Sequence, residues 1–111
     1  MDITIKIFQD YLKERYGGWA KEESLFLKLT EELGEVAEVI NKRAGIKSKE
    51  ASEGLSNELG EELSDMIHYI IAIASINDID LSAALINKDR KGSKKYDHDT
   101  NLETFIIKTQ N

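Results

Sequence analysis

Apolar residues recur every three or four positions along most of this chain, a spacing that predicts helices with one face turned toward a core. The pattern over residues 3–16 ends at a glycine pair, which is typical of a helix C-terminus. It resumes near residues 21–24 and continues to Ala44, where Gly45 supplies the next stop. Two helices are therefore predicted before a change of pattern.

A third helix is predicted after a polar connection over residues 46–55. Ser56 is a good N-cap, and Glu58 in the first turn suits the positive end of the helix dipole. The pattern continues through Ile76 and is apolar almost all round from Ile70 onward. We expect that second half to be buried on several sides, in the subunit core or against another subunit.

Two shorter helices are predicted in the rest of the chain. Asp80 caps a segment from Leu81 to about Lys91, and Thr100 with Glu103 reads as a capping box ahead of the apolar residues 105–107. We expect these last apolar residues to dock on a partner subunit. The chain has no proline to interrupt its helices. The predicted fold class is all-α, a four- to five-helix bundle.

Composition narrows the class of protein. A chain of 111 residues is expected to form one domain, residues 1–111. The absence of Cys excludes disulfides and thiolate metal sites and suits a reducing cytoplasm, and the net charge of -6 argues against a nucleic-acid polymer as partner. The longest apolar run, residues 66–76, is too short for a membrane span, and the N-terminus lacks the apolar segment of a signal peptide. A cytoplasmic protein with no membrane partner is expected.

An acidic motif occurs twice in the chain. Residues 29–40 and residues 59–70 share Leu, Glu-Glu-Leu and Ile in register at an offset of thirty positions. Glu35 of the first copy corresponds to Asp65 of the second. The chain therefore contains an acidic helix and a near copy of it.

A helical projection places the acids of both copies alike. With about 100° per residue, Glu32 lies about 60° and Glu35 about 120° from the apolar stripe of the first helix, and Glu62 and Asp65 take the same positions in the second. The predicted stripes comprise Leu25, Leu29, Leu33, Val36 and Ile40, then Leu63, Met66, Ile70 and Ile73. The residues that point away are Glu31, Glu38, Glu61 and His68. If the helices pack as a central antiparallel pair, four carboxylates converge on one seam.

Converging carboxylates repel one another and raise one another's pKa unless a cation lies among them. Hard divalent cations with oxygen ligands meet that need, and Mg²⁺ typically takes one or two carboxylates together with water and substrate phosphates. Mn²⁺ is a possible substitute. The alternative interpretation is that a chain with 32% charged residues simply has acidic, solvated helix faces.

The motif pair also resembles a known family. Glu32-x-x-Glu35, then 26 intervening residues, then Glu62-x-x-Asp65, each with Glu-Glu-Leu, is similar to the MazG-like all-α nucleoside triphosphate pyrophosphohydrolases. Relatives within that superfamily include dCTP pyrophosphatase, dimeric dUTPase and phosphoribosyl-ATP pyrophosphohydrolase. The resemblance covers roughly residues 19–96.

The resemblance implies a reaction. The reaction is attack by water on the α-phosphorus of a nucleoside triphosphate, which gives the monophosphate and pyrophosphate. A role of this reaction in removing non-standard nucleotides, called house-cleaning, is one expectation. Glu32, Glu35, Glu62 and Asp65 would hold Mg²⁺, and Glu35, by analogy with the family, would orient or deprotonate the water. Separately, the apolar second half of the third predicted helix and the apolar C-terminal tail lead us to expect a homodimer or homotetramer.

The resemblance also suggests substrate-binding residues near the start of the first acidic helix. Trp19 could stack on the base, and Lys28 is a further candidate, as is Phe26. The alternative for Trp19, the only tryptophan of the chain, is a partly buried core residue.

Cations crowd a segment near the C-terminus. Lys88 stands where the family has a Lys, Lys94-Lys95-Tyr96 resembles the basic-basic-aromatic end of the family's segment, and Lys91 lies between them. By resemblance these residues contact phosphate and sugar. Gly92 or Ser93 stands where the family often has Asn, which puts sugar recognition in doubt. The alternative interpretation is a solvated basic turn.

Three other functions are compatible with parts of the pattern. Phosphoribosyl-ATP hydrolysis is the nearest enzymatic alternative, and a non-enzymatic helical module for oligomerisation or regulation is the alternative from a different class. The third is a di-iron carboxylate bundle. Such a bundle requires Glu-x-x-His on two helices, whereas this chain has only Asp65-x-x-His68.

Overall fold

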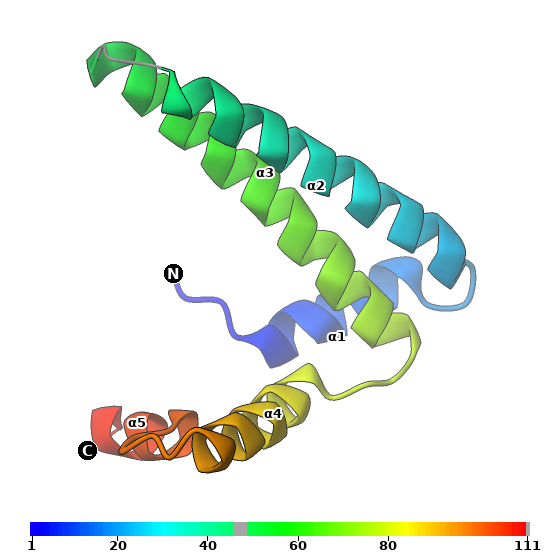
Figure 1. The fold of residues 1–111 in the computed structure, drawn as a ribbon. Helices are drawn as coiled ribbons and strands as arrows, with labels where there is room; N and C mark the ends of the chain where they lie inside the picture. Colours follow the sequence, from blue (N-terminus) through cyan, green and yellow to red (C-terminus); the bar gives the residue numbers. More distant parts are fainter. Residues whose placement is uncertain (46–48, 111) are drawn as a thin grey trace.

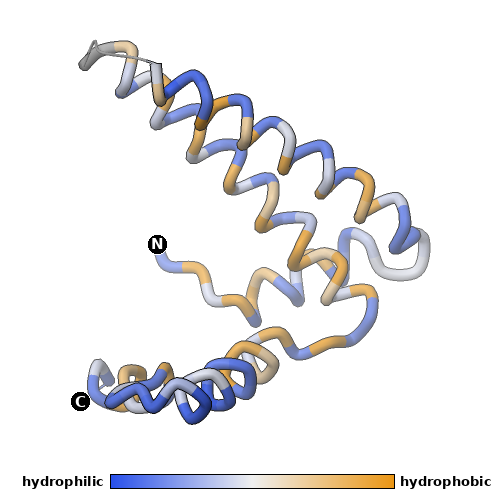
Figure 2. The backbone as a smooth tube through the Cα atoms, in the orientation of Figure 1, coloured by the Kyte–Doolittle hydropathy of each residue, from blue (hydrophilic) through white to orange (hydrophobic). Residues whose placement is uncertain are grey.

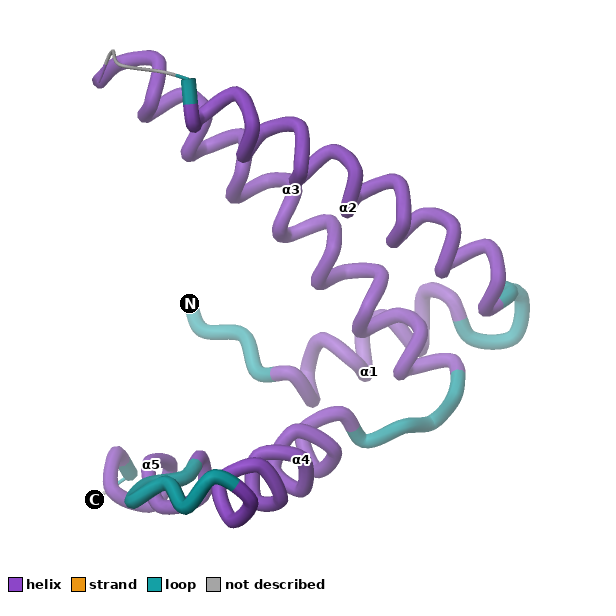
Figure 3. The backbone as a smooth tube through the Cα atoms, in the orientation of Figure 1, coloured by secondary structure: helices purple, strands orange, loops and turns teal. Residues whose placement is uncertain are grey.

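The computed structural model describes residues 1–45 and 49–110, and the described residues form five helices and no strand (Figure 3). The helices are α1 (Ile5–Tyr16), α2 (Glu22–Ala44), α3 (Lys49–Ile76), α4 (Leu81–Lys95) and α5 (Leu102–Thr109). The predicted all-α class is confirmed.

The helices divide into a long hairpin, a cross-helix and an arm (Figure 1). α2 and α3 run antiparallel and pack side by side along their length, and we call this pair the hairpin. α1 crosses the base of the hairpin and packs on α3. α4 and α5 pack on each other as a separate arm, and α4 meets the rest of the chain at α1. The predicted central pair of acidic helices is thus present, in an open arrangement.

The core lies where α1 crosses the hairpin. Leu12 and Tyr16 of α1, Leu25 of α2, and Ile71 and Ala72 of α3 are buried together. Apolar stretches of α1 and α3 meet at this crossing (Figure 2). Burying one large apolar side chain contributes roughly 1.5–3 kcal/mol. This cluster therefore fixes α1 against the base of the hairpin.

Hydrogen bonds from α1 hold the start of the arm. The side-chain amide of Gln9 donates to the Ile79 carbonyl at 2.6 Å and accepts from the Leu81 backbone N–H at 3.0 Å. Lys13 pairs with Asp78 at 3.1 Å. Asp80 caps α4 as predicted, because its carboxylate accepts from the Ala83 N–H at 3.0 Å. These contacts set the direction in which α4 leaves the core.

Two predicted element boundaries are wrong. Residues 49–55 were expected in a polar connection, but α3 begins at Lys49, so Ser56 lies inside the helix and is not its N-cap. Lys, Glu, Ala and Leu in this stretch favour helix despite its polar character. The predicted connection over residues 46–48 lies outside the described residues. α4 extends to Lys95 rather than Lys91, because Gly92 continues the helix at some cost in propensity.

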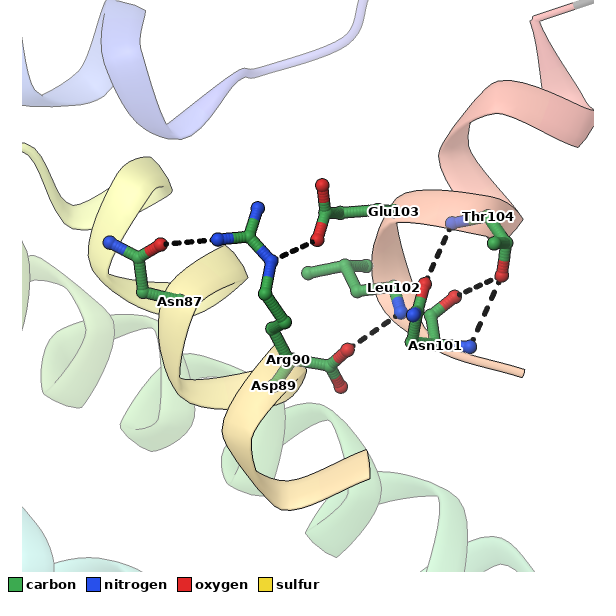
Figure 4. Close-up of polar contacts among 7 residues, drawn as sticks. All are labelled: Asn87, Asp89, Arg90, Asn101, Leu102, Glu103 and Thr104. Atoms are coloured by element: carbon green, nitrogen blue, oxygen red, sulfur yellow. Dashed lines mark hydrogen bonds and ion pairs between the residues drawn. The ribbon is translucent and has the colours of Figure 1, made fainter. Parts of the chain in front are cut away.

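The C-terminal capping box is shifted by one residue from its predicted place. Asn101 is the N-cap of α5, and its side-chain oxygen accepts from the Thr104 backbone N–H at 2.9 Å (Figure 4). In return, the Asn101 backbone N–H donates to the Thr104 hydroxyl at 3.2 Å. Thr100 therefore does not cap α5. Glu103 instead accepts from Arg90 at 2.7 Å, and this pair links α5 to α4.

The buried face of α2 is rotated from the predicted stripe. Val39 is 2% exposed, whereas Leu33 and Ile40, both predicted inside, are 55% and 50% exposed. Leu63 and Ile70 of α3 are likewise exposed. The face that packs at the seam therefore lies closer to the carboxylates than the apolar pattern implied.

No single helix in the described part of the chain has both the length and the apolar composition to cross a membrane. α3 from Ala51 and α4 meet that test only as a joined pair, which is bent by 103°.

Candidate functional site

Three carboxylates of the repeated motifs lie together on the hairpin. Glu32 and Glu35 come from α2 and Glu62 from α3, and one carboxylate oxygen of each lies within 4.8 Å of the others. Glu32 and Glu35 are neighbours because they are three residues apart on one helix, and antiparallel packing of α3 adds Glu62. We call these three residues the acidic cluster. Carboxylate oxygens are the ligands that Mg²⁺ and Ca²⁺ take in proteins.

The acidic cluster contains oxygens that no described protein group satisfies. Glu32 and Glu62 are half-buried, whereas Glu35 is exposed. Oε2 of Glu32 and Oε2 of Glu62 are both buried without a hydrogen-bond partner. A buried carboxylate oxygen is costly unless it is paired or coordinates a metal. The donor set therefore fits a divalent cation.

The cluster also holds protons more tightly than isolated carboxylates do. Burial raises the pKa of Glu32, and the negative charges of Glu35 and Asp65 raise it further. Hydrogen bonding to Glu35, followed by burial, raises the pKa of Glu62 to about 7. Carboxyl groups that converge in a half-buried site cannot all ionise freely, so they share a proton. A cation that binds here would have to displace it.

Asp65, the fourth predicted ligand, stands beside the acidic cluster. It is exposed on α3 and is not among the three residues whose oxygens meet. Its negative charge nevertheless raises the pKa of Glu32. Glu31 and Glu61, predicted to point outward, are exposed, and Glu31 pairs with Lys28 at 3.5 Å.

A pocket of about 380 Å³ opens at the base of the hairpin, where α1 crosses it. Three aromatic residues line it, Tyr16, Trp19 and Tyr69, and we call them the aromatic wall. The other lining residues are Ala20, Lys21, Ser24, Leu25 and Lys28. Trp19 is 69% exposed, so the alternative of a partly buried core residue is wrong. The pocket thus brings the predicted residues Trp19 and Lys28 together.

The pocket lies about one helical turn from the acidic cluster on α2 and about two turns from it on α3. Lys28 precedes Glu32 by four residues, and Tyr69 follows Asp65 by four. Burial raises the pKa of Tyr69; the charges of Glu32 and Asp65 raise it further, while that of Lys28 lowers it. Tyr69 of the pocket is therefore within electrostatic reach of Glu32 in the acidic cluster.

The basic segment lies elsewhere in the molecule. Its predicted members, all on the arm and all exposed, are Lys88, Lys91, Lys94, Lys95 and Tyr96. The Lys95 ammonium lies 5.3 Å from the centroid of the Tyr96 ring. α4 packs on α1 and α5 rather than on the hairpin, so the structure does not bring these cations to the acidic cluster of the same chain.

Comparison with known proteins places the chain in a family. The MazG nucleotide pyrophosphohydrolase domain matches residues 20–98. The chain belongs to the MazG nucleotide pyrophosphohydrolase family. The matched range agrees with the extent of the resemblance seen in the sequence and contains the acidic cluster, Asp65 and the basic segment.

The chain is also similar to two individual proteins. The uncharacterized protein YpjD of Bacillus subtilis (strain 168) is 36% identical over 88 residues, which cover 75% of this chain and 78% of that protein. The crystal structure of iMazG from Vibrio DAT 722 is 29% identical in sequence, with a TM-score of 0.64 over 85% of this chain and 98% of that one. The fold is therefore that of a MazG-type protein.

Sequence reasoning missed two aromatic residues of this MazG-family site. Tyr16 ends α1 and Tyr69 lies on α3, yet both line the pocket. A signal for Tyr69 was present, since it follows Asp65 by one turn on the same helix. No comparable signal existed for Tyr16, because its place depends on how α1 crosses the hairpin.

Proposed function

We propose that this protein is a Mg²⁺-dependent nucleoside triphosphate pyrophosphohydrolase, which converts a nucleoside triphosphate and water into the monophosphate and pyrophosphate. One observation carries the proposal. Three carboxylates, two of which have an unsatisfied buried oxygen, lie one helical turn along α2 from an aromatic pocket, in a chain of the MazG family. This arrangement joins a cation site to a surface on which a base can stack.

Each residue has a proposed part in holding the cation. Glu32 and Glu62 would supply buried oxygens and Glu35 an exposed one, and Asp65, whose charge acts on Glu32, is the proposed fourth ligand. Mg²⁺ bound there would neutralise phosphate charge and polarise phosphate oxygens, with Mn²⁺ as a possible substitute.

The remaining chemistry is positioning and proton transfer. Water attacks the α-phosphorus, the bond to the bridging oxygen breaks, and pyrophosphate leaves with that oxygen. Glu35, the exposed member of the acidic cluster, would accept the proton of the water. Glu35 suits this task because it is the one of the three clustered carboxylates that is exposed to solvent.

The substrate would lie between the pocket and the acidic cluster. Trp19 would stack on the base, and Lys28, one turn from Glu32, would meet the phosphates first. The outer phosphates and the sugar would be contacted by the basic segment, which comprises Lys88, Lys91, Lys94, Lys95 and Tyr96. Their place on the arm means that a second copy of the chain, or a movement of the arm, would have to bring them there.

The decisive experiment is a panel of canonical and modified nucleotides with Mg²⁺ or Mn²⁺, scored for pyrophosphate and for phosphate separately. Release of pyrophosphate alone is expected, and preference for a modified nucleotide would support house-cleaning. Phosphoribosyl-ATP belongs in the panel, because turnover of that compound alone would favour the alternative enzyme. Absence of pyrophosphate release from every compound would favour a non-enzymatic module.

A further inference from the structure

His68 of α3 lies behind the aromatic wall, near the point where α1 crosses the hairpin. The sequence predicted that this residue points away, but the structure half-buries it against α1. The Tyr16 hydroxyl and His68 Nε2 are 2.7 Å apart and share a hydrogen bond. The His68 ring also meets the rings of Tyr16 and Tyr69 nearly edge-on, at 5.6 Å and 5.0 Å between centroids. One side chain therefore contacts two of the three residues of the aromatic wall.

The Tyr16 hydroxyl needs the partner that His68 provides. Tyr16 is only 9% exposed, and a buried hydroxyl without a hydrogen bond is costly. Burial lowers the pKa of His68 and the Arg15 charge lowers it further, against the opposing effect of the Asp65 charge. A neutral imidazole can accept the hydroxyl proton at Nε2. Without this acceptor, Tyr16 would have to turn its hydroxyl toward water, and its ring would leave its place in the wall.

Trp19, the third residue of the aromatic wall, is exposed but held at two points. Its ring is tilted against the Tyr16 ring at 5.6 Å between centroids. Its Nε1–H donates to the Arg15 carbonyl at 2.8 Å. Arg15 and Tyr16 are the last two residues of α1, so both contacts depend on where the end of α1 lies. An exposed indole that is held in this way is a pre-organised surface for a planar ligand.

The turn that carries Trp19 is also restricted. Gly18 has a φ of 88°, a conformation that residues with a side chain rarely adopt. A Cβ on Gly17 would overlap the Lys13 carbonyl oxygen, which accepts from the Gly17 N–H at 2.7 Å. The chain therefore leaves α1 along one path, and that path places Trp19 beside Tyr16.

We propose that His68 is a positioning residue, which holds Tyr16 and through it Trp19 in place for a base. The hydrogen bond joins the end of α1, which carries the stacking surface, to α3, which carries Glu62 and Asp65. The helix that would hold the cation thus also fixes the surface that would hold the base. The base and the phosphates of one nucleotide would then bind at a set separation. This proposal rests on the proposed function.

Matched substitutions separate the hydrogen bond from the ring contacts. Tyr16→Phe removes one hydroxyl, and His68→Phe removes the acceptor but keeps a ring against Tyr69. His68→Gln does the reverse, because its amide can bond the hydroxyl but has no ring. Tyr11→Phe, at an exposed tyrosine of α1 outside the pocket, is the control. Circular dichroism checks that each variant remains helical, and Tyr16→Phe, which deletes a single oxygen atom, keeps the test available if a His68 variant fails to fold.

Trp19 is the only tryptophan of the chain, so its fluorescence reports on the stacking surface without a ligand. Tyr16→Phe and His68→Phe should each lower its fluorescence anisotropy and increase its quenching by acrylamide, because the indole loses the ring that holds it. His68→Gln and Tyr11→Phe should keep both values near those of the unmodified chain. Unchanged fluorescence in both Tyr16→Phe and His68→Phe overturns the role of His68.

Binding is measured for the canonical ribo- and deoxyribonucleoside triphosphates, with Ca²⁺ in place of Mg²⁺ to slow turnover, and the one that binds most tightly is used for the variants. Tyr16→Phe and His68→Phe should each weaken its binding about three- to tenfold, as loss of one hydrogen bond allows. The double variant should bind no more weakly than the weaker-binding single one, because both substitutions remove the same contact. His68→Gln should recover most of the loss.

Inorganic tripolyphosphate separates positioning of the base from general damage, because it has phosphates and no base. Its affinity should be unchanged in every variant, and with Mg²⁺ the KM for the nucleotide should rise while kcat stays within about twofold. Equal weakening of nucleotide and tripolyphosphate, or no weakening of either, overturns the role of His68. Failure of the unmodified chain to bind any nucleotide overturns both proposals. Nucleotide binding with the expected variant pattern but without pyrophosphate release overturns the proposed function alone and leaves the role of His68 standing.

Discussion

The raised pKa of Glu62 makes a quantitative prediction about cation binding. Hydrogen bonding to Glu35 and burial raise this pKa to about 7, so the acidic cluster holds a shared proton near neutral pH. A divalent cation requires ionised carboxylates and must displace that proton. The apparent cation affinity should therefore rise with pH across this range.

The size of the effect follows from the pKa. With a value of about 7, Glu62 is ionised in roughly one molecule in eleven at about pH 6 and in roughly ten in eleven at about pH 8. The apparent affinity for Mg²⁺ or Mn²⁺ should differ about tenfold between these conditions. An isolated exposed Glu, with its ordinary pKa near 4.5, would give almost no change.

Isothermal titration calorimetry with Mn²⁺ at several pH values measures this dependence, and buffers of different ionisation enthalpy count the protons released. Glu62→Gln removes the titrating group, so binding should become weaker at every pH and lose most of its dependence on pH. Glu61→Gln, at the exposed neighbouring position, is the matched control and should keep the tenfold change. Equal affinity at about pH 6 and about pH 8 in the unmodified chain would refute the reasoning.

Three further results are expected. Glu32→Ala should abolish Mg²⁺-dependent turnover and Glu31→Ala leave it nearly intact, so equal losses in the pyrophosphate assay would contradict the assigned faces of α2. Leu12→Ala, at a fully buried side chain, should lower the free energy of unfolding by about 2–5 kcal/mol in urea denaturation, and a change below about 1 kcal/mol would count against the core. The Arg90 guanidinium lowers the pKa of Glu103, so the stability that this pair gives the arm is present above the ordinary pKa and lost as pH falls through the lowered one. The hydrogen-exchange protection factor of α5, which corrects for the slower intrinsic exchange in acid, should therefore fall as pH falls, and Glu103→Gln should remove that dependence.

The sequence predicted the parts of the fold that depend on local pattern. Helical spacing, the glycine pair after α1 and Gly45 after α2 marked the helices, and the duplicated motif marked the acidic cluster. These features succeed because capping and periodicity act over a few residues. The predicted start of α3 was wrong because residues 49–55 are polar helix formers, and their composition resembles that of a loop.

The rest depended on how helices pack against one another. The apolar pattern of α2 is broader than the strip that meets α3, so it could not determine which part is buried, and Leu33 was placed wrongly. The position of Tyr16 in the pocket depends on the crossing of α1, and the position of Lys88 on the direction in which α4 leaves the core. Such long-range geometry has no counterpart in the spacing of one helix.

Fewer buried apolar residues hold α2 and α3 together near the acidic cluster than at the base of the hairpin. The core cluster with α1 lies at its base, whereas further along α2 the buried residues are only Val36 and Val39, among the described residues, and half-buried carboxylates share the seam. Carboxylates that repel one another at a helix interface favour its opening. A cation bound to the acidic cluster would oppose that opening. Because the cation would bind residues of both helices, its binding should stabilise the hairpin against unfolding, as linkage requires of a ligand that binds only the folded state.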